Sequence, residues 1–234
     1  MNASEQNQST TSLRGAAEGK GKPRFAAIIF DMDGVIVDSE PRHEQAFREI
    51  FQEMGLGDRH GMDFTEYYGR SDRALWLDFI ARHTPSQSLE ELAAWKQGRF
   101  LEILERDQPI FEAFPGLLKR LAPHYKLAVA SGSMHPVIDR VLAMRQLRLY
   151  FSAVVSVADV PRGKPAPDVF LRAAELLGVP ANRCCVIENA ATGVEGALAA
   201  KMEVIAITNT LPRARLRQAT HVVETYEQIE KLLL

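Results

Sequence analysis

Cysteine is scarce in this sequence, and the two cysteines that occur, Cys184 and Cys185, are adjacent within an apolar segment. Neighbouring residues of a strand point to opposite faces, so this pair can form neither a disulfide framework nor a metal knuckle. Apolar runs are also short, and none approaches the roughly 20 residues that cross a bilayer as a helix. These absences favour a cytoplasmic protein of a reducing compartment, with no membrane partner.

The sequence also lacks a dense block of one charge. Its 28 basic and 30 acidic residues give a formal net charge of −2, and the nearest approach to a basic cluster, at 213–217, has arginine only at alternate positions. Alternate positions on a helix do not share a face, so we expect no nucleic-acid partner. Residues 1–22 are rich in Ser, Thr, Gln, Asn and Gly and lack the apolar core of a signal peptide, so we expect a disordered tail there.

The hydrophobic content of 46% over 234 residues is enough for a sizeable core. From residue 115 onward, strand and helix patterns alternate, which is typical of a parallel sheet with crossover helices. Short apolar runs predict strands at 25–30, 126–130, 153–157, 184–187, 204–207 and 222–223. Between the first two strands the spacing predicts three helices, at 41–54 with Ser39 as its cap, at 72–82 and at 89–106.

We therefore predict an α/β fold: a Rossmann-like parallel sheet core with helices on both faces and an inserted all-helical cap domain. The core would comprise residues 23–39 and 111–234, and the cap residues 40–110. Such an insert leaves and returns at the carboxyl ends of the strands. It would therefore lie beside the polar residues that follow the strands.

The most informative segment is DMDGVIVD at 31–38, directly after the first apolar run. Asp31 and Asp33 lie one residue apart at the carboxyl end of a predicted strand, where side chains two positions apart point the same way. The two carboxylates could share a metal ion, or could act as nucleophile and acid/base. A turn rich in Asp and Gly that merely ends the strand is the alternative at this point.

Polar residues also follow three other predicted strands. The turn Ser131-Gly132-Ser133 could offer N–H groups to an anion or simply cap a helix. Lys164, between Gly and Pro, could neutralise a phosphate or be a solvated loop residue. Glu188 and Asn189 could complete an oxygen site for Mg²⁺ opposite the aspartates. If the strands are parallel, these residues lie at one edge of the sheet. Together they supply the carboxylates, the metal site, the hydroxyl and the lysine that phosphoryl transfer requires.

The four motifs, in this order, resemble those of the haloacid dehalogenase-like (HAD) superfamily of aspartate-nucleophile phosphatases. The resemblance is carried by DMDGVIVDSE at 31–40, ASGS at 130–133, GKPAPDVF at 163–170 and VIENAATGVEGALAA at 186–200. The helical insert resembles the cap of the subgroup that contains β-phosphoglucomutase and phosphoglycolate phosphatase. The resemblance implies a Mg²⁺-dependent enzyme that forms an aspartyl-phosphate with a small phosphorylated substrate.

By this resemblance Asp31 is the nucleophile, and Asp33 is the general acid that protonates the leaving oxygen and then activates water. Ser131 and Lys164 would hold the phosphate. The Asp31 carboxylate and the Asp33 backbone carbonyl would bind Mg²⁺ with help from the pair at 188–189. Relatives that cleave carbon–halogen bonds lack the second aspartate, so Asp33 favours phosphate esters.

Two positions depart from the family pattern. Relatives usually carry two acids in the fourth motif, whereas Glu188 is here followed by Asn189, whose amide can bind Mg²⁺ but adds no charge. Lys201 stands where many relatives carry glycine, which leaves the form of that turn open.

Six residues of the predicted cap are candidates for substrate binding. A histidine that matches His43 assists proton transfer in β-phosphoglucomutase, and Lys96 lies near a cap lysine of that enzyme. The turn Gly69-Arg70-Ser71 resembles the family's substrate-specificity loop, where Arg70 or Arg73 could bind a second anionic group. A surface histidine, a solvated lysine and a helix-starting loop are the ordinary alternatives. Helical spacing assigns three aromatic residues to the cap core: Trp76, Trp95 and Phe100.

Three functions remain open for this sequence. The first is a monomeric, Mg²⁺-dependent phosphatase acting on a small phosphorylated metabolite such as a sugar phosphate. The second is a β-phosphoglucomutase-like isomerase, which His43 and Lys96 permit and the single acid at 188–189 disfavours. The third is a HAD-like binding protein without turnover, for which Asn189 is the only support.

Overall fold

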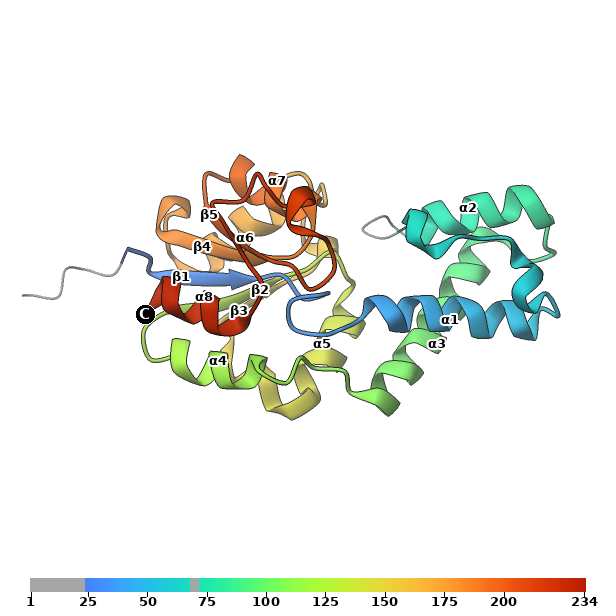
Figure 1. Ribbon diagram of the computed structural model, residues 1–234, viewed down its shortest axis with the longest axis horizontal. Helices are drawn as coiled ribbons and strands as arrows, with labels where there is room; N and C mark the ends of the chain where they lie inside the picture. The colour runs from blue at the N-terminus through green and yellow to red at the C-terminus, as the bar shows by residue number, and fades with distance from the viewer. Residues whose placement is uncertain (1–23, 68–71) are drawn as a thin grey trace, which may run out of the picture.

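The computed structural model describes residues 24–67 and 72–234. The predicted tail, 1–22, and the turn Gly69-Arg70-Ser71 lie outside the described residues. Within them, six parallel strands form a sheet in the order β3-β2-β1-β4-β5-β6 (Figure 1). The strands are β1 (Ala27–Phe30), β2 (Lys126–Ala130), β3 (Ala153–Val155), β4 (Cys184–Glu188), β5 (Glu203–Ile207) and β6 (His221–Val223).

Helices alternate with the strands from β2 onward. They are α4 (Phe114–Leu121), which precedes β2, and then α5 (His135–Ala143), α6 (Asp168–Leu177), α7 (Ala191–Ala199) and α8 (Tyr226–Leu233). Between β1 and β2 lie α1 (Glu40–Glu53), α2 (Asp72–His83) and α3 (Leu89–Asp107). The described residues also form short 3-10 helices at Gly57–His60, Phe64–Tyr67, Met144–Tyr150, Val157–Asp159, Ala181–Arg183 and Arg213–Arg215. The predicted α/β fold class is confirmed.

The two faces of the sheet carry side chains of different size. Large residues such as Phe30 and Ile187 form a core with α4, α5 and α8, whereas small residues such as Ala128 form a second core with α6 and α7. Cys185 belongs to the first core and Cys184 to the second, and both are free thiols. The strands are apolar on both faces because helices cover both, as in other parallel sheets.

Helices α1, α2 and α3 form a helical unit that packs around its own apolar cluster, apart from the sheet (Figure 1). Trp76 is fully buried in this cluster, and Trp95 is partly buried against it. Phe100 is also buried, beneath the end of the unit that faces the sheet domain. Trp76 and Trp95 thus pack in the apolar cluster of the helical unit as predicted, whereas Phe100 belongs instead to the core cluster of the sheet domain.

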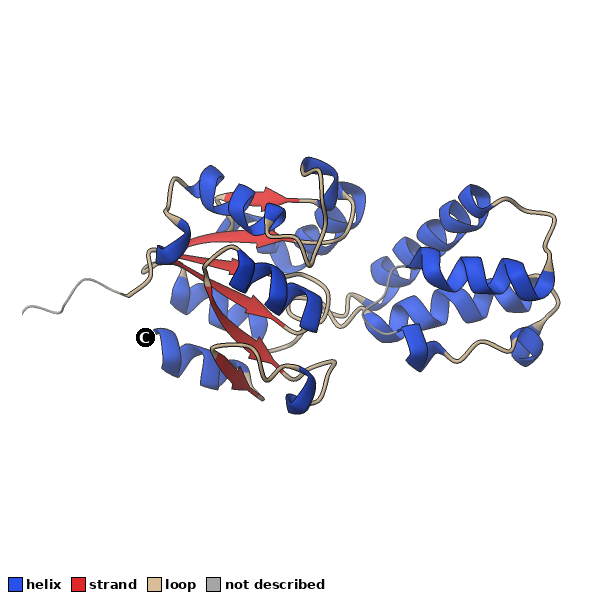
Figure 2. Cartoon of the chain, turned by 90° about the horizontal axis from the view of Figure 1, so that it is seen from above, coloured by secondary structure: helices blue, strands red, loops and turns tan. Residues whose placement is uncertain are grey.

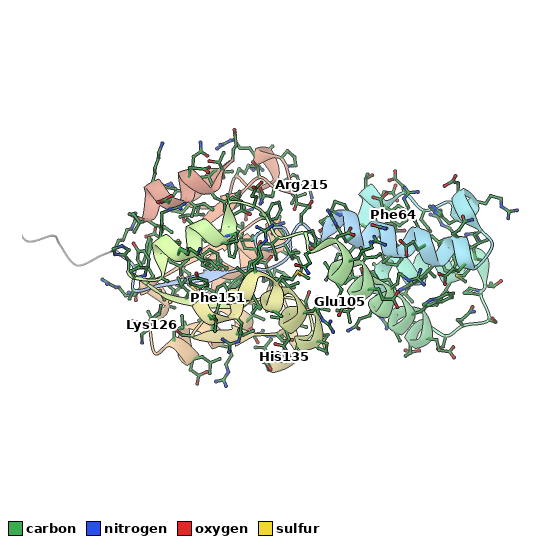
Figure 3. All side chains as sticks on the ribbon, turned by 90° about the horizontal axis from the view of Figure 1, so that it is seen from below. Phe64, Glu105, Lys126, His135, Phe151 and Arg215 are labelled. Carbon is green, nitrogen blue, oxygen red and sulfur yellow. The ribbon has the colours of Figure 1, made fainter. Side chains whose placement is uncertain are left out.

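The helical unit lies at the carboxyl ends of the strands, toward which all the arrowheads point (Figure 2). Its two linkers pair with each other: the N–H of Asp38 donates to the carbonyl of Pro109 at 2.8 Å, and the N–H of Phe111 donates to the carbonyl of Ile36 at 3.2 Å. Glu105 of α3 lies where the unit meets the sheet domain and forms an ion pair with Arg140 of α5 (Figure 3). These contacts hold the unit over one edge of the sheet.

One local expectation needs correction, and one open point is answered. Ser39 precedes α1 but does not cap it, because its backbone is already near the helical region (φ −88°, ψ −25°) and its buried hydroxyl has no partner among the described residues. Lys201 adopts φ +60°, so the turn after α7 keeps the left-handed geometry that glycine favours. Among the described helices, none is long and apolar enough to cross a membrane.

Candidate active site

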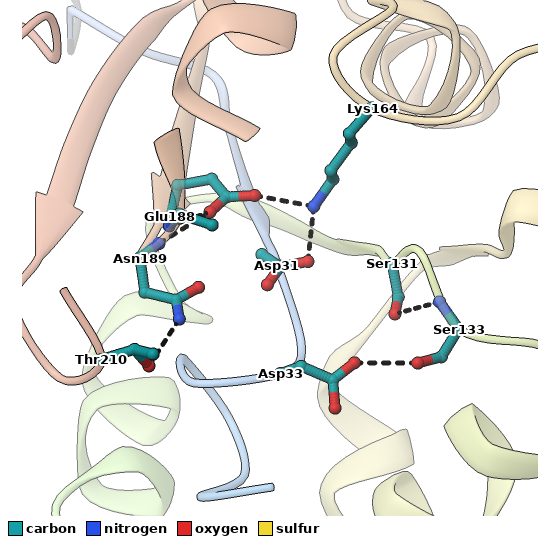
Figure 4. A network of polar contacts seen from close by, with 9 residues as sticks. Asp31, Asp33, Ser131, Ser133, Lys164, Glu188, Asn189 and Thr210 are labelled. Atoms are coloured by element: carbon teal, nitrogen blue, oxygen red, sulfur yellow. Dashed lines mark hydrogen bonds and ion pairs between the residues drawn. The ribbon is translucent and has the colours of Figure 1, made fainter. Parts of the chain in front are cut away.

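The site is built around the ammonium group of Lys164. Its Nζ donates to Oδ1 of Asp31 at 2.5 Å and to Oε1 of Glu188 at 2.7 Å (Figure 4). Asp31 directly follows β1, Glu188 ends β4, and Lys164 lies in the loop before α6. Because Phe30 and Ile187 are paired in the parallel register, the two carboxylates that follow them reach the same edge of the sheet.

Lys164 and its partners are almost removed from solvent, with side chains of Lys164, Asp31 and Glu188 only 11%, 9% and 1% exposed. Burial alone would lower the pKa of Lys164, but the two carboxylates raise it above its ordinary value, so the lysine stays charged. Burial raises the pKa of Asp31, and the nearby Lys164 opposes that effect. Asp31 therefore depends on neighbouring positive charge to ionise at neutral pH.

Glu188 anchors the lysine. Its Oε2 accepts hydrogen bonds from the backbone N–H groups of Asn189 at 2.7 Å and Ala190 at 2.8 Å, while Oε1 faces Lys164. Gly193 leaves room for this carboxylate, because a Cβ atom there would overlap it. Both oxygens of Glu188 thus have donors, and its predicted role as a metal ligand stays a prediction.

Asn189 presents an unpaired oxygen to the site. Its Oδ1 is buried without a hydrogen-bond partner among the described residues, while Nδ2 donates to Oγ1 of Thr210 at 2.8 Å. In Figure 4 this oxygen faces the Asp31 carboxylate. Gly34 lies against the Asn189 amide. It adopts φ +77°, and any side chain there would overlap that amide. The backbone after Asp33 therefore packs directly on Asn189.

Mg²⁺ fits these residues. The ion prefers oxygen ligands, and the unpaired Oδ1 of Asn189 lies beside the carboxylate of Asp31. Within residues 24–67 and 72–234, no three His, Cys, Asp or Glu side chains are grouped so that they could hold a metal ion by themselves.

Asp33 has different partners from Asp31. Its Oδ2 accepts a hydrogen bond from the hydroxyl of Ser133 at 2.8 Å, and its Oδ1 is buried without a partner in the described part of the chain. The N–H of Ser133 donates to Oγ of Ser131 at 3.0 Å. Ser131 is fully buried behind this turn. One aspartate thus lies beside a cation and the other beside a neutral hydroxyl.

A cavity of about 880 Å³ extends from the sheet edge to the helical unit. Of the predicted residues, it is lined by Asp31, Asp33, His43, Arg73, Lys96, Gly132, Ser133, Lys164, Glu188 and Asn189. Ser131 is absent from this lining, and it supports Ser133 from behind. The cavity thus brings predicted residues of the sheet domain together with predicted residues of the helical unit.

The helical unit contributes a buried lysine to the cavity wall. Lys96 is only 2% exposed, donates to Oδ2 of Asp72 at 2.6 Å and contacts Nδ1 of His43. Burial and the Lys96 charge lower the pKa of His43 below its ordinary value, so its imidazole is neutral. An ammonium group can only donate, so Nδ1 accepts and the ring proton is on Nε2. The ring stacks on Phe100 with centroids 3.9 Å apart.

Three residues of this site were not identified from the sequence: Glu40, Asp72 and Thr210. Thr210 follows β5, so the rule that the carboxyl ends of parallel strands meet at one edge could have found it. Asp72 and Glu40 begin helices, where acids are common for helix stability alone. Nothing in the sequence around Asp72 and Glu40 shows that their side chains also line the cavity.

Replacing Gly193 by alanine should displace the Glu188 carboxylate and separate it from Lys164. A buried ion pair broken on one side is costly, so we expect the free energy of unfolding to fall by about 3 kcal/mol. The matched control is Gly98→Ala in α3, where a Cβ meets nothing and should stabilise the helix by up to about 1 kcal/mol. Urea denaturation measures both, and equal effects of the two substitutions would contradict the role of Gly193.

Glu40 gives a pH-dependent test. Burial, then the charges of Asp33 and Asp72, raise its pKa from 4.5 to about 7. Between these values the folded protein holds a proton that the unfolded chain has lost, so Glu40 makes folding less favourable as pH rises through this window. Glu40→Gln should leave stability unchanged at pH 4.5 and increase it at pH 8, as measured by denaturation. The control is Glu195→Gln, at an exposed position of α7, and an equal gain at both pH values would refute the expectation.

Comparison with known proteins agrees with this arrangement. Residues 25–201 match the hydrolase family described as haloacid dehalogenase-like hydrolase. The protein SUPPRESSOR OF QUENCHING 1, chloroplastic, of Arabidopsis thaliana is 36% identical over 91% of this chain, but the chain spans only 21% of that protein. Fructose-1-phosphate phosphatase YqaB of Escherichia coli is 32% identical, and the match covers 78% of this chain and 96% of the relative.

Solved structures show the same fold. The crystal structure of β-phosphoglucomutase from Clostridium difficile superimposes with a TM-score of 0.73, covering 89% of this chain and 95% of that one at 24% identity. At that identity the likeness establishes the architecture alone. The family match and the relatives together confirm the predicted superfamily and the prediction of an enzyme: the chain belongs to the haloacid dehalogenase-like hydrolases.

Proposed function

We propose that the chain is a Mg²⁺-dependent phosphatase that hydrolyses a sugar phosphate through a phosphorylated Asp31. The observation that carries this proposal is the separation of the two aspartates, with Asp31 beside the buried cation Lys164 and Asp33 beside a hydroxyl. Cleavage of a phosphate ester needs an anionic nucleophile and a proton donor, which two such carboxyl groups can provide. The fructose-1-phosphate phosphatase among the relatives supports a sugar phosphate as substrate.

The reaction would proceed in two steps. In the first, a carboxylate oxygen of Asp31 bonds to phosphorus while the bond from phosphorus to the sugar oxygen breaks, and Asp33 gives its proton to that oxygen. In the second, the oxygen of a water molecule bonds to the phosphorus of the aspartyl-phosphate while the bond from phosphorus to the Asp31 oxygen breaks, and the water gives a proton to Asp33. Inorganic phosphate then leaves, and both aspartates return to their starting states. Lys164 stays beside the reacting carboxylate throughout and balances charge on the phosphoryl group.

Three oxygen donors would hold Mg²⁺: the Asp31 carboxylate, Oδ1 of Asn189 and the Asp33 backbone carbonyl. When bound, the ion would neutralise charge on the phosphoryl oxygens and favour the ionised form of Asp31. The backbone N–H groups of the 131–133 turn would bind the remaining phosphoryl oxygens. Ser131 would position that turn through its hydrogen bond with Ser133.

We also propose that residues 40–110 act as a cap on a core of residues 23–39 and 111–234. The cavity between the helical unit and the sheet edge supports this division, since closure over it would exclude water from the aspartyl-phosphate. A monomeric state, a cytoplasmic location and a substrate-binding role for Gly69, Arg70 and Ser71 stay predictions.

A β-phosphoglucomutase-like isomerase is the second candidate, because His43 and Lys96 line the same cavity as Asp33. Such an enzyme would return the phosphoryl group from Asp31 to another hydroxyl of a sugar phosphate instead of to water. Conversion of β-glucose 1-phosphate to glucose 6-phosphate with little phosphate release would identify it. The intact pairing of Asp31 with Lys164 argues against a binding protein without turnover.

Phosphate release from a panel of sugar phosphates with Mg²⁺ tests the proposed roles of the two aspartates. Asp31→Asn removes the nucleophile and should reduce release to background. Asp33→Asn removes the proton donor and should lower kcat by about 10²- to 10⁴-fold. Asp139→Asn, on the exposed side of α5, is the matched control and should match the wild type. Undiminished release by Asp31→Asn would disprove the mechanism.

Asn189→Asp tests the metal site. The change adds a negative charge where the unpaired oxygen lies, so we expect Mg²⁺ to bind about tenfold more tightly, as ligand charge is a main determinant of affinity. Thr210 can donate to the new carboxylate, so the local contact is kept. Titration calorimetry with Mg²⁺ measures the dissociation constant without turnover. Unchanged affinity would show that residue 189 does not contact the ion, and Asn189→Ala should weaken binding.

A further inference from the structure

The charges that line the cavity limit what can occupy its inner end. Six carboxyl groups line it, those of Asp31, Asp33, Glu40, Glu44, Asp72 and Glu188, against three cationic groups, those of Arg73, Lys96 and Lys164. Lys164 is paired with two of the carboxylates. A phosphoryl dianion at Asp31 therefore already relies on Mg²⁺ for neutralisation. A second dianion would enter a wall with no unpaired buried cation among the described residues.

Lys96 could in principle receive a second anion, but its contacts prevent this. Asp72 accepts from its Nζ at 2.6 Å, and His43 accepts through Nδ1. The aromatic rings of Phe47 and Phe100 lie under the ammonium, with centroids 5.1 and 4.6 Å from Nζ. Arg73, the other cation of this wall, is exposed, so solvent and salt screen its charge.

We propose that the cavity selects a monophosphate whose leaving group bears no second anionic group, and that Asp72 determines this selection by neutralising Lys96. The inference rests on the proposed phosphatase function and deepens it by defining the substrate class. Asp72 begins α2 and is itself half-exposed, so it would contact an incoming anion directly as a like charge. Asp72 is therefore a specificity-determining residue that the motifs do not contain.

The rest of the wall suits a neutral polyol. Because Nδ1 of His43 accepts from Lys96, Nε2 carries the proton that can donate to a substrate hydroxyl. Gln97 adds an amide, which can both donate and accept, and Phe47 and Phe64 add apolar faces for the carbon skeleton. Neutral donors and aromatic rings bind hydroxyl groups and C–H groups without requiring a charge.

The charges of Lys96 and Asp72 also affect whether the protein could act as an isomerase. Returning a phosphoryl group to a sugar phosphate necessarily forms a bisphosphate, and that bisphosphate must bind in the closed cavity with one phosphate beside the helical unit. An acid that neutralises the only buried lysine of the described helical wall opposes such a complex. Asp72 therefore favours hydrolysis over isomerisation.

Fructose 1-phosphate and fructose 1,6-bisphosphate provide the direct test, because they share a sugar and differ by a second phosphate. The wild type should show a kcat/KM for the bisphosphate at least about tenfold lower than for the monophosphate, as like-charge contact costs more than a kcal/mol. Equal or greater kcat/KM for the bisphosphate would overturn the inference while leaving the phosphatase function intact.

The substitution Asp72→Asn tests whether Asp72 causes the preference for the monophosphate. The amide oxygen can still accept from Lys96, so the lysine keeps a partner while its charge is no longer cancelled. The ratio of kcat/KM for bisphosphate to that for monophosphate should rise severalfold. Glu90→Gln, an equal change of charge at an exposed position of α3 outside the cavity, should leave the ratio unchanged. An unaltered ratio in Asp72→Asn, with the fold retained by circular dichroism, would refute the role of Asp72.

Failure of the proposed function gives a different result, namely no phosphate release from either sugar. In that case neither ligand is consumed, and their equilibrium binding to the wild-type protein with Mg²⁺ can be measured by calorimetry. Tighter binding of the monophosphate would still support selection by charge. Equal or tighter binding of the bisphosphate would reject it.

Discussion

The buried ammonium of Lys164 is the interaction on which the rest of the site depends. A charge removed from water is stable only when it is paired and hydrogen-bonded, so Lys164 needs both Asp31 and Glu188, and they need it. Glu188 is in turn held by the backbone N–H groups that lead into α7. The ends of β1 and β4 and the loop before α6 are thereby fixed against one another. The carboxylate of Asp31, the proposed nucleophile, is thus oriented before a substrate arrives.

Charge is cancelled in the same way on the other side of the cavity. Lys96 is paired with Asp72 inside the helical unit, as Lys164 is paired with carboxylates at the sheet edge. The two pairs differ in the polar groups that lie beside them and can contact a ligand. At the sheet edge, one oxygen each of Asp33 and Asn189 has no partner among the described residues, which favours a cation and a phosphoryl group there. At the helical wall the pairing leaves neutral donors, which suit hydroxyl groups.

Most of the polar residues at the carboxyl edge of the sheet could be predicted from the sequence. Asp31, Lys164 and Glu188 could be placed together because parallel strands share one carboxyl edge, and the apolar runs located those strands to within two residues. The pairing of Lys96 with Asp72 could not be predicted in this way, because it depends on how α2 packs against α3, which periodicity does not specify. Ser39 failed as a cap because its backbone is near the helical region and its side chain is buried, neither of which the local sequence specifies.

The central claim is that Asp31 becomes phosphorylated. The most direct measurement is acid quenching of the Mg²⁺-loaded enzyme within a single turnover of a sugar phosphate that it hydrolyses, followed by mass spectrometry of its peptides. The account predicts one phosphoryl group on Asp31, none on Asp33, and none in Asp31→Asn. Phosphate release without any phosphorylated Asp31 at early times, or a phosphoryl group carried by another residue, would contradict it.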